Sequence, residues 1–395
     1  MKLLCLSNGH GEDVIAVRIL QELERKSPQV ELVALPIVGA GKAYQSLDIP
    51  IWGKVQVMPS GGFNQDRQQL WRDVQGGLIQ LSIEQWRSVR RWAAAGGKIL
   101  AVGDLVPLIL AWQSGTQYAF VGTAKSEYYL RHPDSELLAG HSIESRLGGV
   151  YFPWERWLLS RPNCQAVFPR DQITTEAMQK FGIPAHDLGN PMMDGLETAW
   201  RPSDQKDLQL TLIPGSRPPE VYQNWELILQ GLDSLIQAEV SKTIGAVAAV
   251  TPSLDIAEFE RLLEQHQWQP IVDAWVKQNC TLNLWTARYN DCLAYGQMAI
   301  AMAGTATEQF VGLGKPAIIM PGAGPQFTRL FAERQTRLLG ESVILVDSPE
   351  LLGEIVSEII LDIDRLQRIR ANGLRRMGQA GAAAKIADCL WRKWS

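Results

Sequence analysis

An apolar run that breaks at a glycine and leads into a helix is the feature that most constrains the fold of this chain. The run covers residues 298–303, Gly304 follows it, and Thr305 and Thr307 begin a helical pattern. This is the pattern of a buried parallel strand that turns into a helix at its carboxyl end. Such a turn leaves backbone N–H groups unpaired beside the positive end of a helix, so it can bind an anion.

A second turn of the same kind lies earlier in the chain. There the apolar residues 210–213 run into Pro214, Gly215, Ser216 and Arg217. One such turn is a weak signal. Two in the same half predict a diphosphate held between helix N-termini, because one of them also carries a guanidinium, which matches phosphate oxygens in pairs.

Strand patterns alternate with helical patterns along most of the chain, which predicts parallel, doubly wound α/β sheets. At 395 residues the chain is too long for one ordinary core. We expect domains at residues 1–188 and 189–377. The expected strands are residues 3–7, 30–36, 55–58, 99–102, 118–121, 166–169, 210–213, 245–250, 281–285, 298–303, 317–320 and 343–346.

Composition excludes several functional classes. A net charge of -4 argues against a general nucleic-acid binder, which would carry a basic face. Five dispersed cysteines without a C-x-x-C pair are typical of reduced thiols in a cytosolic protein. No signal-peptide pattern and no uninterrupted membrane-spanning run is found, so we expect a cytoplasmic protein.

These motifs resemble a known family. The stretches 213–217 (Ile-Pro-Gly-Ser-Arg), 189–191 (Gly-Asn-Pro) and 304–307 (Gly-Thr-Ala-Thr), with Gly314 and Pro316, look like lipid-A-disaccharide synthase. More closely, they resemble the lipid-A-disaccharide synthase-related branch of photosynthetic bacteria. That family is similar to the GT-B glycosyltransferases, with two Rossmann-like domains facing a central cleft. The resemblance implies a hexosyltransferase with a UDP-sugar donor in the C-terminal domain and a lipid-linked acceptor near the N-terminal one. It also implies that a C-terminal helix at about 378–395 packs back on the first domain.

The resemblance also implies a set of donor-binding residues. The family's ribose-binding glutamate is replaced here by Gln309, with Glu308 before it, so the donor can differ. The alternative for the turn at residues 304–307 is a plain capped helix. The donor-binding candidates are Gly215, Ser216, Arg217, Gly304, Thr305, Ala306, Thr307, Glu308 and Gln309, together with Gln326 as a sugar contact from the loop at residues 321–327.

The glycine-rich loop after the first strand is the candidate acceptor loop. It contains Asn8, Gly9, His10 and Gly11 and is similar to the Gly-Gly-His loops of the peptidoglycan and galactolipid enzymes. His10 is a candidate general base, because imidazole titrates near neutral pH. Asp104 follows another strand end and is either the base or the residue that orients His10. The alternatives are a histidine that bonds its own loop and an aspartate that caps a helix.

Two segments rich in tryptophan and basic residues, 67–98 and 151–161, are candidates for contact with a membrane surface. The alternative is that their apolar residues belong to the core and only the basic side faces water. Helical spacing alone does not separate the two interpretations.

The sequence therefore predicts an inverting glycosyltransferase, cytoplasmic or peripheral on the inner face of a membrane, which moves a sugar such as N-acetylglucosamine to a lipid-type acceptor. No metal or other cofactor is expected, and the UDP-sugar is a co-substrate. Two alternatives stay open: a UDP-sugar epimerase or hydrolase, and a non-catalytic nucleotide-sugar-binding protein. A Rossmann dehydrogenase is disfavoured, because no G-x-G-x-x-G follows the first strand.

Overall fold

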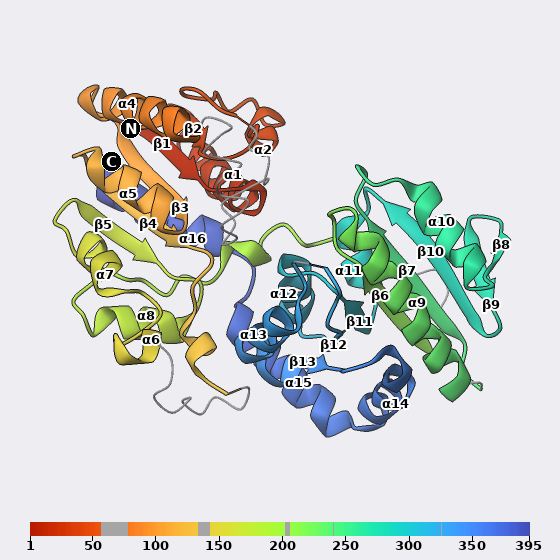
Figure 1. Cartoon of the computed structure of the whole chain (residues 1–395). Coiled ribbons are helices and arrows are strands. Elements are labelled where there is room, and N and C mark those ends of the chain that lie inside the picture. The colour runs from red at the N-terminus through yellow and green to blue at the C-terminus, as the bar shows by residue number, and fades with distance from the viewer. Residues whose placement is uncertain (57–77, 133–142, 202–205, 240, 325) are drawn as a thin grey trace. The chain divides into compact units, whose positions relative to one another are not determined.

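The computed structural model describes the chain except for residues 57–77, 133–142, 202–205, 240 and 325. The chain forms two compact units. Of the described residues, the first contains Met1–Leu130, residues 143–195 and Gln379–Ser395. The second contains Arg131, His132 and Leu196–Gly378. Figure 1 shows each unit as a sheet flanked by helices.

The sheet of the first unit has five strands in the order β2-β1-β3-β4-β5, all paired in parallel. Their inward residues form a continuous apolar core, as expected for a parallel sheet covered on both faces. The strands are β1 (Lys2–Ser7), β2 (Glu31–Pro36), β3 (Lys98–Gly103), β4 (Tyr118–Gly122) and β5 (Cys164–Phe168). The helices are α1 (His10–Lys26), α2 (Lys42–Gln45), α4 (Leu78–Ala94), α5 (Leu105–Gln113), α6 (Ile143–Arg146), α7 (Pro153–Leu159), α8 (Gln172–Gln179) and α16 (Ala382–Trp394), with short 3-10 turns η1 (Glu127–Leu130) and η2 (Pro191–Met193).

The last helix, α16, belongs to the first unit and packs against α1. Its N-terminus is capped by Asp194, whose carboxylate accepts hydrogen bonds from the N–H groups of Gly381, Ala382 and Ala383. These are backbone donors that a helix leaves unpaired at its first turn. The cap therefore fixes where α16 begins.

The sheet of the second unit has eight strands in the order β13-β12-β11-β6-β7-β10-β9-β8. All pairs are parallel except β10 with β9 and β9 with β8. The strands are β6 (Leu208–Ile213), β7 (Ile244–Val250), β8 (Gln269–Ile271), β9 (Ala274–Lys277), β10 (Cys280–Thr286), β11 (Met298–Ala301), β12 (Ala317–Ile319) and β13 (Val343–Leu345). The helices are α9 (Glu220–Ala238), α10 (Ile256–Gln265), α11 (Tyr289–Tyr295), α12 (Thr305–Gly312), α13 (Arg329–Leu339), α14 (Leu352–Leu361) and α15 (Ile363–Met377), with 3-10 turns η3 (Gly340–Ser342) and η4 (Pro349–Leu351).

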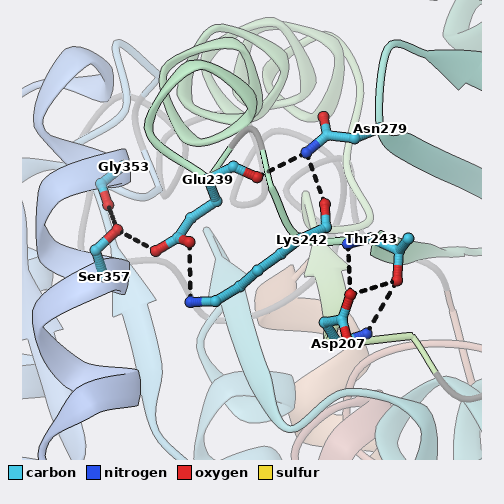
Figure 2. A network of polar contacts seen from close by, with 7 residues as sticks. All are labelled: Asp207, Glu239, Lys242, Thr243, Asn279, Gly353 and Ser357. Carbon is cyan, nitrogen blue, oxygen red and sulfur yellow. Dashed lines mark hydrogen bonds and ion pairs between the residues drawn. The ribbon is translucent and has the colours of Figure 1, made fainter.

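A network of polar side chains ties the amino ends of the second sheet together (Figure 2). Asp207, just before β6, accepts hydrogen bonds from the N–H and hydroxyl of Thr243, just before β7, at 2.7 and 2.8 Å. Asn279, just before β10, donates to the carbonyls of Glu239 and Lys242 at 2.7 Å each. The Glu239 carboxylate pairs with Lys242 at 2.9 Å, which lowers its pKa. These contacts hold the starts of β6, β7 and β10 together.

The predicted parallel, doubly wound α/β class is confirmed by both sheets. The expected strand at residues 55–58 is wrong as far as it is described: Val55 and Gln56 are not in a strand, and residues 57 and 58 lie outside the described residues. The place beside β2 is taken by Ile51, which forms a bridge with Ala34. The antiparallel β8–β9 hairpin was not predicted, because its strands are short and largely exposed.

Candidate functional site

The two predicted turns of the second unit lie side by side. β6 and β11 are neighbours in the sheet, and the chain order reverses between them, since β7 lies on one side and β12 on the other. The two strands pair in parallel up to Ile213 and Ala301, and the Met302 N–H donates to the Ile213 carbonyl at 2.8 Å. Ligands of doubly wound folds bind outside the carboxyl ends of the strands at such a switch point. The sheet therefore brings the two sequence-predicted turns to the place where such ligands bind.

The turn after β6 requires glycine and exposes a cation. Gly215 has φ +107°, and a Cβ at this residue would lie 3.4 Å from the Met302 carbonyl. Ser216 and Arg217 are exposed. Among the residues that the structure describes, no carboxylate is paired with the Arg217 guanidinium.

In the turn after β11, only some of the predicted donor-binding residues are exposed to solvent. Gly304 is the N-cap of α12, and Thr305 is exposed. Thr307 is buried and its hydroxyl donates to the Ala303 carbonyl at 2.6 Å. Gln309 is only 8% exposed, and its Oε1 accepts a hydrogen bond from the Tyr289 hydroxyl at 2.6 Å.

The remaining predicted donor contacts differ in exposure. Ala306 and Glu308 are half-buried beside Thr305, so they stay closer to solvent than Thr307 and Gln309. Gln326 is exposed, but its backbone N–H is held by the Glu220 carboxylate. Its side chain is thus presented from a loop whose backbone is fixed.

Two residues of α9 that the sequence analysis did not single out organise this edge. Asn224 donates from Nδ2 to the Pro214 carbonyl at 3.0 Å and lies 3.5 Å from that of Met302. Glu220 accepts from the N–H groups of Gln326 and Phe327. The sequence did contain a signal for them. Glu220 and Asn224 are polar, lie four residues apart, and are next to residues of the apolar face of a helix.

The carboxyl edge of the first sheet also contains a switch point, between β1 and β3. The Asn8 amide donates to the Asp104 carboxylate at 2.9 Å across it. Asp104 is also the N-cap of α5, where it accepts from the Val106 N–H at 3.1 Å. The structure thus brings the loop at Asn8 and the loop at Asp104 into contact. It also shows Asp104 capping a helix, which was the alternative interpretation of this residue. Burial raises the Asp104 pKa, and the hydrogen bond from Val106 opposes that shift.

The predicted acceptor loop begins α1. Gly9 has φ +154° and is the N-cap of α1, and Gly11 is exposed. His10 is the first residue of the helix, and its side chain is exposed to solvent. Its ring is therefore accessible to an acceptor molecule.

Glu12 is an ionisable residue of this edge that the sequence analysis missed. The Thr123 hydroxyl, just after β4, donates to its carboxylate at 3.3 Å. A Cβ on Gly9 would lie 3.1 Å from Glu12 Oε2, and one on Gly103 would lie 3.4 Å from its Cγ, so two glycines leave room for this side chain. Burial raises the Glu12 pKa, and the charge of Asp104 raises it further, whereas that of His10 lowers it.

A buried hydrogen-bond chain lies beneath this loop. The Tyr44 hydroxyl donates to Ser7 Oγ at 2.6 Å, and Ser7 Oγ donates to Asp13 Oδ1 at 2.5 Å. Asp13 is 2% exposed, and burial raises its pKa to about 6. The carboxyl edge of the first unit thus holds several carboxyl groups whose proton affinity is increased by burial.

The candidate membrane segments are partly core. Residues 67–77 lie outside the described residues. In α4, Trp92 is buried in the core, as the alternative interpretation predicted for this segment, while Ile83, Arg87 and Arg90 are exposed. A hollow of about 600 Å³ is lined by Gly53, Lys54, Glu84, Trp86, Arg87, Ser88, Arg90 and Arg91.

The second segment, around α7, exposes two tryptophans. Trp154 is 53% and Trp157 46% exposed, whereas Leu158 and Leu159 are buried. The Arg161 guanidinium lies 4.3 Å from the centre of the Trp157 ring, a cation–π geometry. Aromatic rings with basic partners thus face solvent on this part of the surface.

Two searches were confined to the described residues. None of their helices has the length and apolar content needed to cross a bilayer. No group of three or more histidine, cysteine, aspartate or glutamate side chains among them is arranged to hold a metal ion.

Comparison with known proteins identifies the fold. No protein-family model matches the chain, and no curated protein sequence does. Among solved structures, a putative UDP-N-acetylglucosamine 2-epimerase from Listeria monocytogenes is similar with a TM-score of 0.61 at 13% identity, over 100% of this chain and 97% of that one. MurG from Acinetobacter baumannii has a TM-score of 0.58 at 12% identity, over 99% of each chain. UDP-GlcNAc 2-epimerase from Neisseria meningitidis, bound to UDP-GlcNAc, has a TM-score of 0.58 at 15% identity, over 99% and 100%.

These similarities extend over nearly the whole chain, so the fold is of the GT-B type, as predicted. At such low identities they show the fold alone. The narrower resemblance to lipid-A-disaccharide synthase stays a prediction.

Proposed function

We propose that this chain is an inverting glycosyltransferase that moves a sugar from a UDP-sugar to a lipid-type acceptor. The observation that carries the proposal is the pair of turns after β6 and β11, which lie side by side at the switch point of the second sheet. Helix N-termini and Arg217 at this edge suit a diphosphate. The names of the similar structures support a UDP-sugar as the ligand, since one of them is bound to UDP-GlcNAc.

The proposed reaction divides between the two units. The acceptor hydroxyl attacks the anomeric carbon, the bond from that carbon to the UDP oxygen breaks, and direct displacement inverts the anomeric centre. Arg217 and the backbone N–H groups of the two turns stabilise the negative charge that develops on UDP. His10 takes the proton of the acceptor hydroxyl, and Asp104 is the second candidate for that role.

Binding of UDP is the first test. Calorimetric titration with UDP, UDP-sugars and other nucleotide sugars should give a measurable affinity for UDP and identify the donor. Radiolabelled donor incubated with membrane lipids should then yield a labelled lipid. If UDP does not bind in the calorimeter, the proposal fails at its first step.

A UDP-sugar epimerase or hydrolase is the second candidate, because two of the similar structures carry the name of a UDP-N-acetylglucosamine 2-epimerase. Such an enzyme needs no acceptor. Conversion of the UDP-sugar in the absence of lipid would favour this candidate over the transferase. Tight UDP binding with no turnover, in the presence or absence of lipid extract, would favour a non-catalytic binding protein.

The lipid acceptor implies a site of contact with a membrane, and we place it at the exposed Trp154 and Trp157. Tryptophan beside basic groups suits the lipid interface, with anionic headgroups attracted by the nearby arginines. Vesicles of phosphatidylglycerol and phosphatidylcholine should sediment the protein at low salt. The double variant Trp154→Ala/Trp157→Ala should sediment less, whereas Leu361→Ala, an exposed apolar residue of the second unit, should not change sedimentation. Equal sedimentation of all three proteins would argue against this surface.

A further inference from the structure

The first turns of α9 place two buried polar side chains on one helix face. Glu220 and Asn224 are four residues apart, which puts them one above the other, and they are 6% and 2% exposed. Val221 and Trp225, beside them in the sequence, belong to the apolar core. A carboxylate and an amide buried in such a place need hydrogen-bonding partners, and these partners are the loops at the carboxyl edge of the sheet.

Asn224 orients the peptide planes of both turns. Its Nδ2 donates to the Pro214 carbonyl at 3.0 Å and lies 3.5 Å from the Met302 carbonyl. Because the C=O and N–H of a trans peptide point in opposite directions, the N–H groups of the next residues, Gly215 and Ala303, point away from Asn224. Within the described part of the chain neither N–H has a hydrogen-bond acceptor. The ends of β6 and β11 thus present two unpaired N–H groups, and both point away from α9.

Glu220 fixes the loop that follows β12. Its carboxylate accepts from the N–H of Phe327 at 2.7 Å and from that of Gln326 at 3.1 and 3.2 Å. The loop approaches so closely that a Cβ on Gly324 would lie 2.3 Å from Glu220 Cγ. A side chain at residue 324 would therefore collide with Glu220, and glycine at this position allows the loop to approach.

We propose that Glu220 and Asn224 are positioning residues that pre-form the phosphate-binding half of the donor site. One face of α9 fixes the backbone of the loops after β6, β11 and β12, so that the N–H groups of Gly215 and Ala303 are already aimed at the diphosphate before the donor binds. This inference rests on the proposed function. It goes further in assigning the selectivity for the diphosphate to Glu220 and Asn224. Such pre-organised donors need no rearrangement when charge develops on the leaving group.

The test compares ligands with and without the diphosphate. Calorimetry measures the affinity for UDP, and ligand-observed NMR measures the affinity for uridine. Asn224→Asp keeps the shape of the side chain but removes the amide hydrogens. It should weaken UDP binding by about tenfold or more, the effect of misaligning a hydrogen bond to a charged group, and leave uridine binding within about twofold. Gln223→Glu is the matched control, since it adds the same charge on an exposed neighbouring residue and should leave UDP affinity within about twofold.

Glu220 offers a rescue experiment. Glu220→Gln keeps an oxygen that accepts the loop N–H groups and should bind UDP within about threefold of the wild type, whereas Glu220→Ala should lose about tenfold. Glu226→Ala, at an exposed residue of the same helix, is the control for loss of a carboxylate. If the α9 variants melt too early to be titrated, Gly324→Ala perturbs the same contact from the loop side and should give the same selective loss of UDP binding.

Each outcome decides the inference. A selective loss of UDP affinity in Asn224→Asp and Glu220→Ala, with rescue by Glu220→Gln, supports it. UDP binding equal to the wild type, or an equal loss of UDP and uridine, overturns it and leaves the proposed function intact. Absence of UDP binding in the wild type would instead overturn the proposed function.

Discussion

The carboxyl edges of the two sheets share one arrangement but hold different chemistry. Each edge has a switch point flanked by two glycine-containing loops. In the first unit the loops carry ionisable groups, His10, Glu12 and Asp104, and burial raises the pKa of both carboxyls. In the second unit the loops carry backbone N–H groups and Arg217, organised from below by an amide and a carboxylate of α9.

This difference indicates a division of labour. Carboxyl and imidazole groups can exchange protons, whereas guanidinium and backbone N–H groups bind anions without titrating. The first edge is thus suited to proton transfer and the second to binding a diphosphate. The predictions below test this contrast between the two edges.

The largest effect is expected at the first edge. His10→Ala should lower the rate of sugar transfer by about 100-fold or more, because general bases contribute at least this much. Calorimetry on the same protein should give an unchanged UDP affinity, since the variant leaves the second edge intact. A loss of less than about tenfold in rate would remove His10 from the role of base.

Asp104→Asn separates capping from catalysis at the same edge. Asparagine also caps helices and can keep the contact to the Val106 N–H. A variant with full activity would assign Asp104 to the capping role alone, whereas a loss comparable to that of His10→Ala would make it the base or the residue that orients His10.

The second edge should respond in the opposite way. Arg217→Ala should weaken UDP binding by about tenfold to 100-fold, because a charge-assisted contact to phosphate is lost. Arg217→Lys should recover only part of the affinity, since ammonium cannot match two phosphate oxygens at once. Unchanged UDP affinity in the alanine variant would show that the diphosphate binds elsewhere.

The sequence predicted the elements of both edges but not their internal contacts. Apolar runs ending in glycine predicted β6 and β11 and the turns that follow them, because a buried strand and the turn after it leave a local pattern. Glu220 and Asn224 were missed, because they form hydrogen bonds with loops that include residues far along the chain. Gln309 was expected to face a ligand, yet it is buried against Tyr289. Side-chain direction at a helix start depends on such distant neighbours, which a local pattern does not contain.

A smaller effect, on stability, should appear at the first edge. Burial raises the Asp13 pKa from 3.8 to about 6, so the folded state binds more protons than the unfolded state between these values. Stability therefore falls as pH rises through this window. Asp13→Asn removes this proton and keeps an oxygen for Ser7. The melting temperature of the variant minus that of the wild type should increase from about pH 4 to about pH 6 and stay constant above it.

Glu12 and Asp104 titrate in the same direction, because burial raises their pKa as well. They are present in both proteins, so the difference between variant and wild type isolates Asp13. A difference that does not change with pH would show that Asp13 has the same pKa in the folded and the unfolded protein, contrary to its burial.

The smallest effect is expected for UDP affinity as a function of pH. Between about pH 7 and about pH 9 the UDP phosphates and Arg217 keep their charges, so the affinity should change by less than about twofold. Burial lowers the pKa of Lys315 in the second unit to about 8. Lys315, however, donates to the Leu293 and Ala294 carbonyls and lies before β12, at the amino edge of the sheet. A fall of UDP affinity in this range would point to a titrating group. The variant Lys315→Met tests whether this group is Lys315, because the variant then loses the fall. A fall that persists in the variant would require a titrating group at the second edge and would remove the contrast between the two edges.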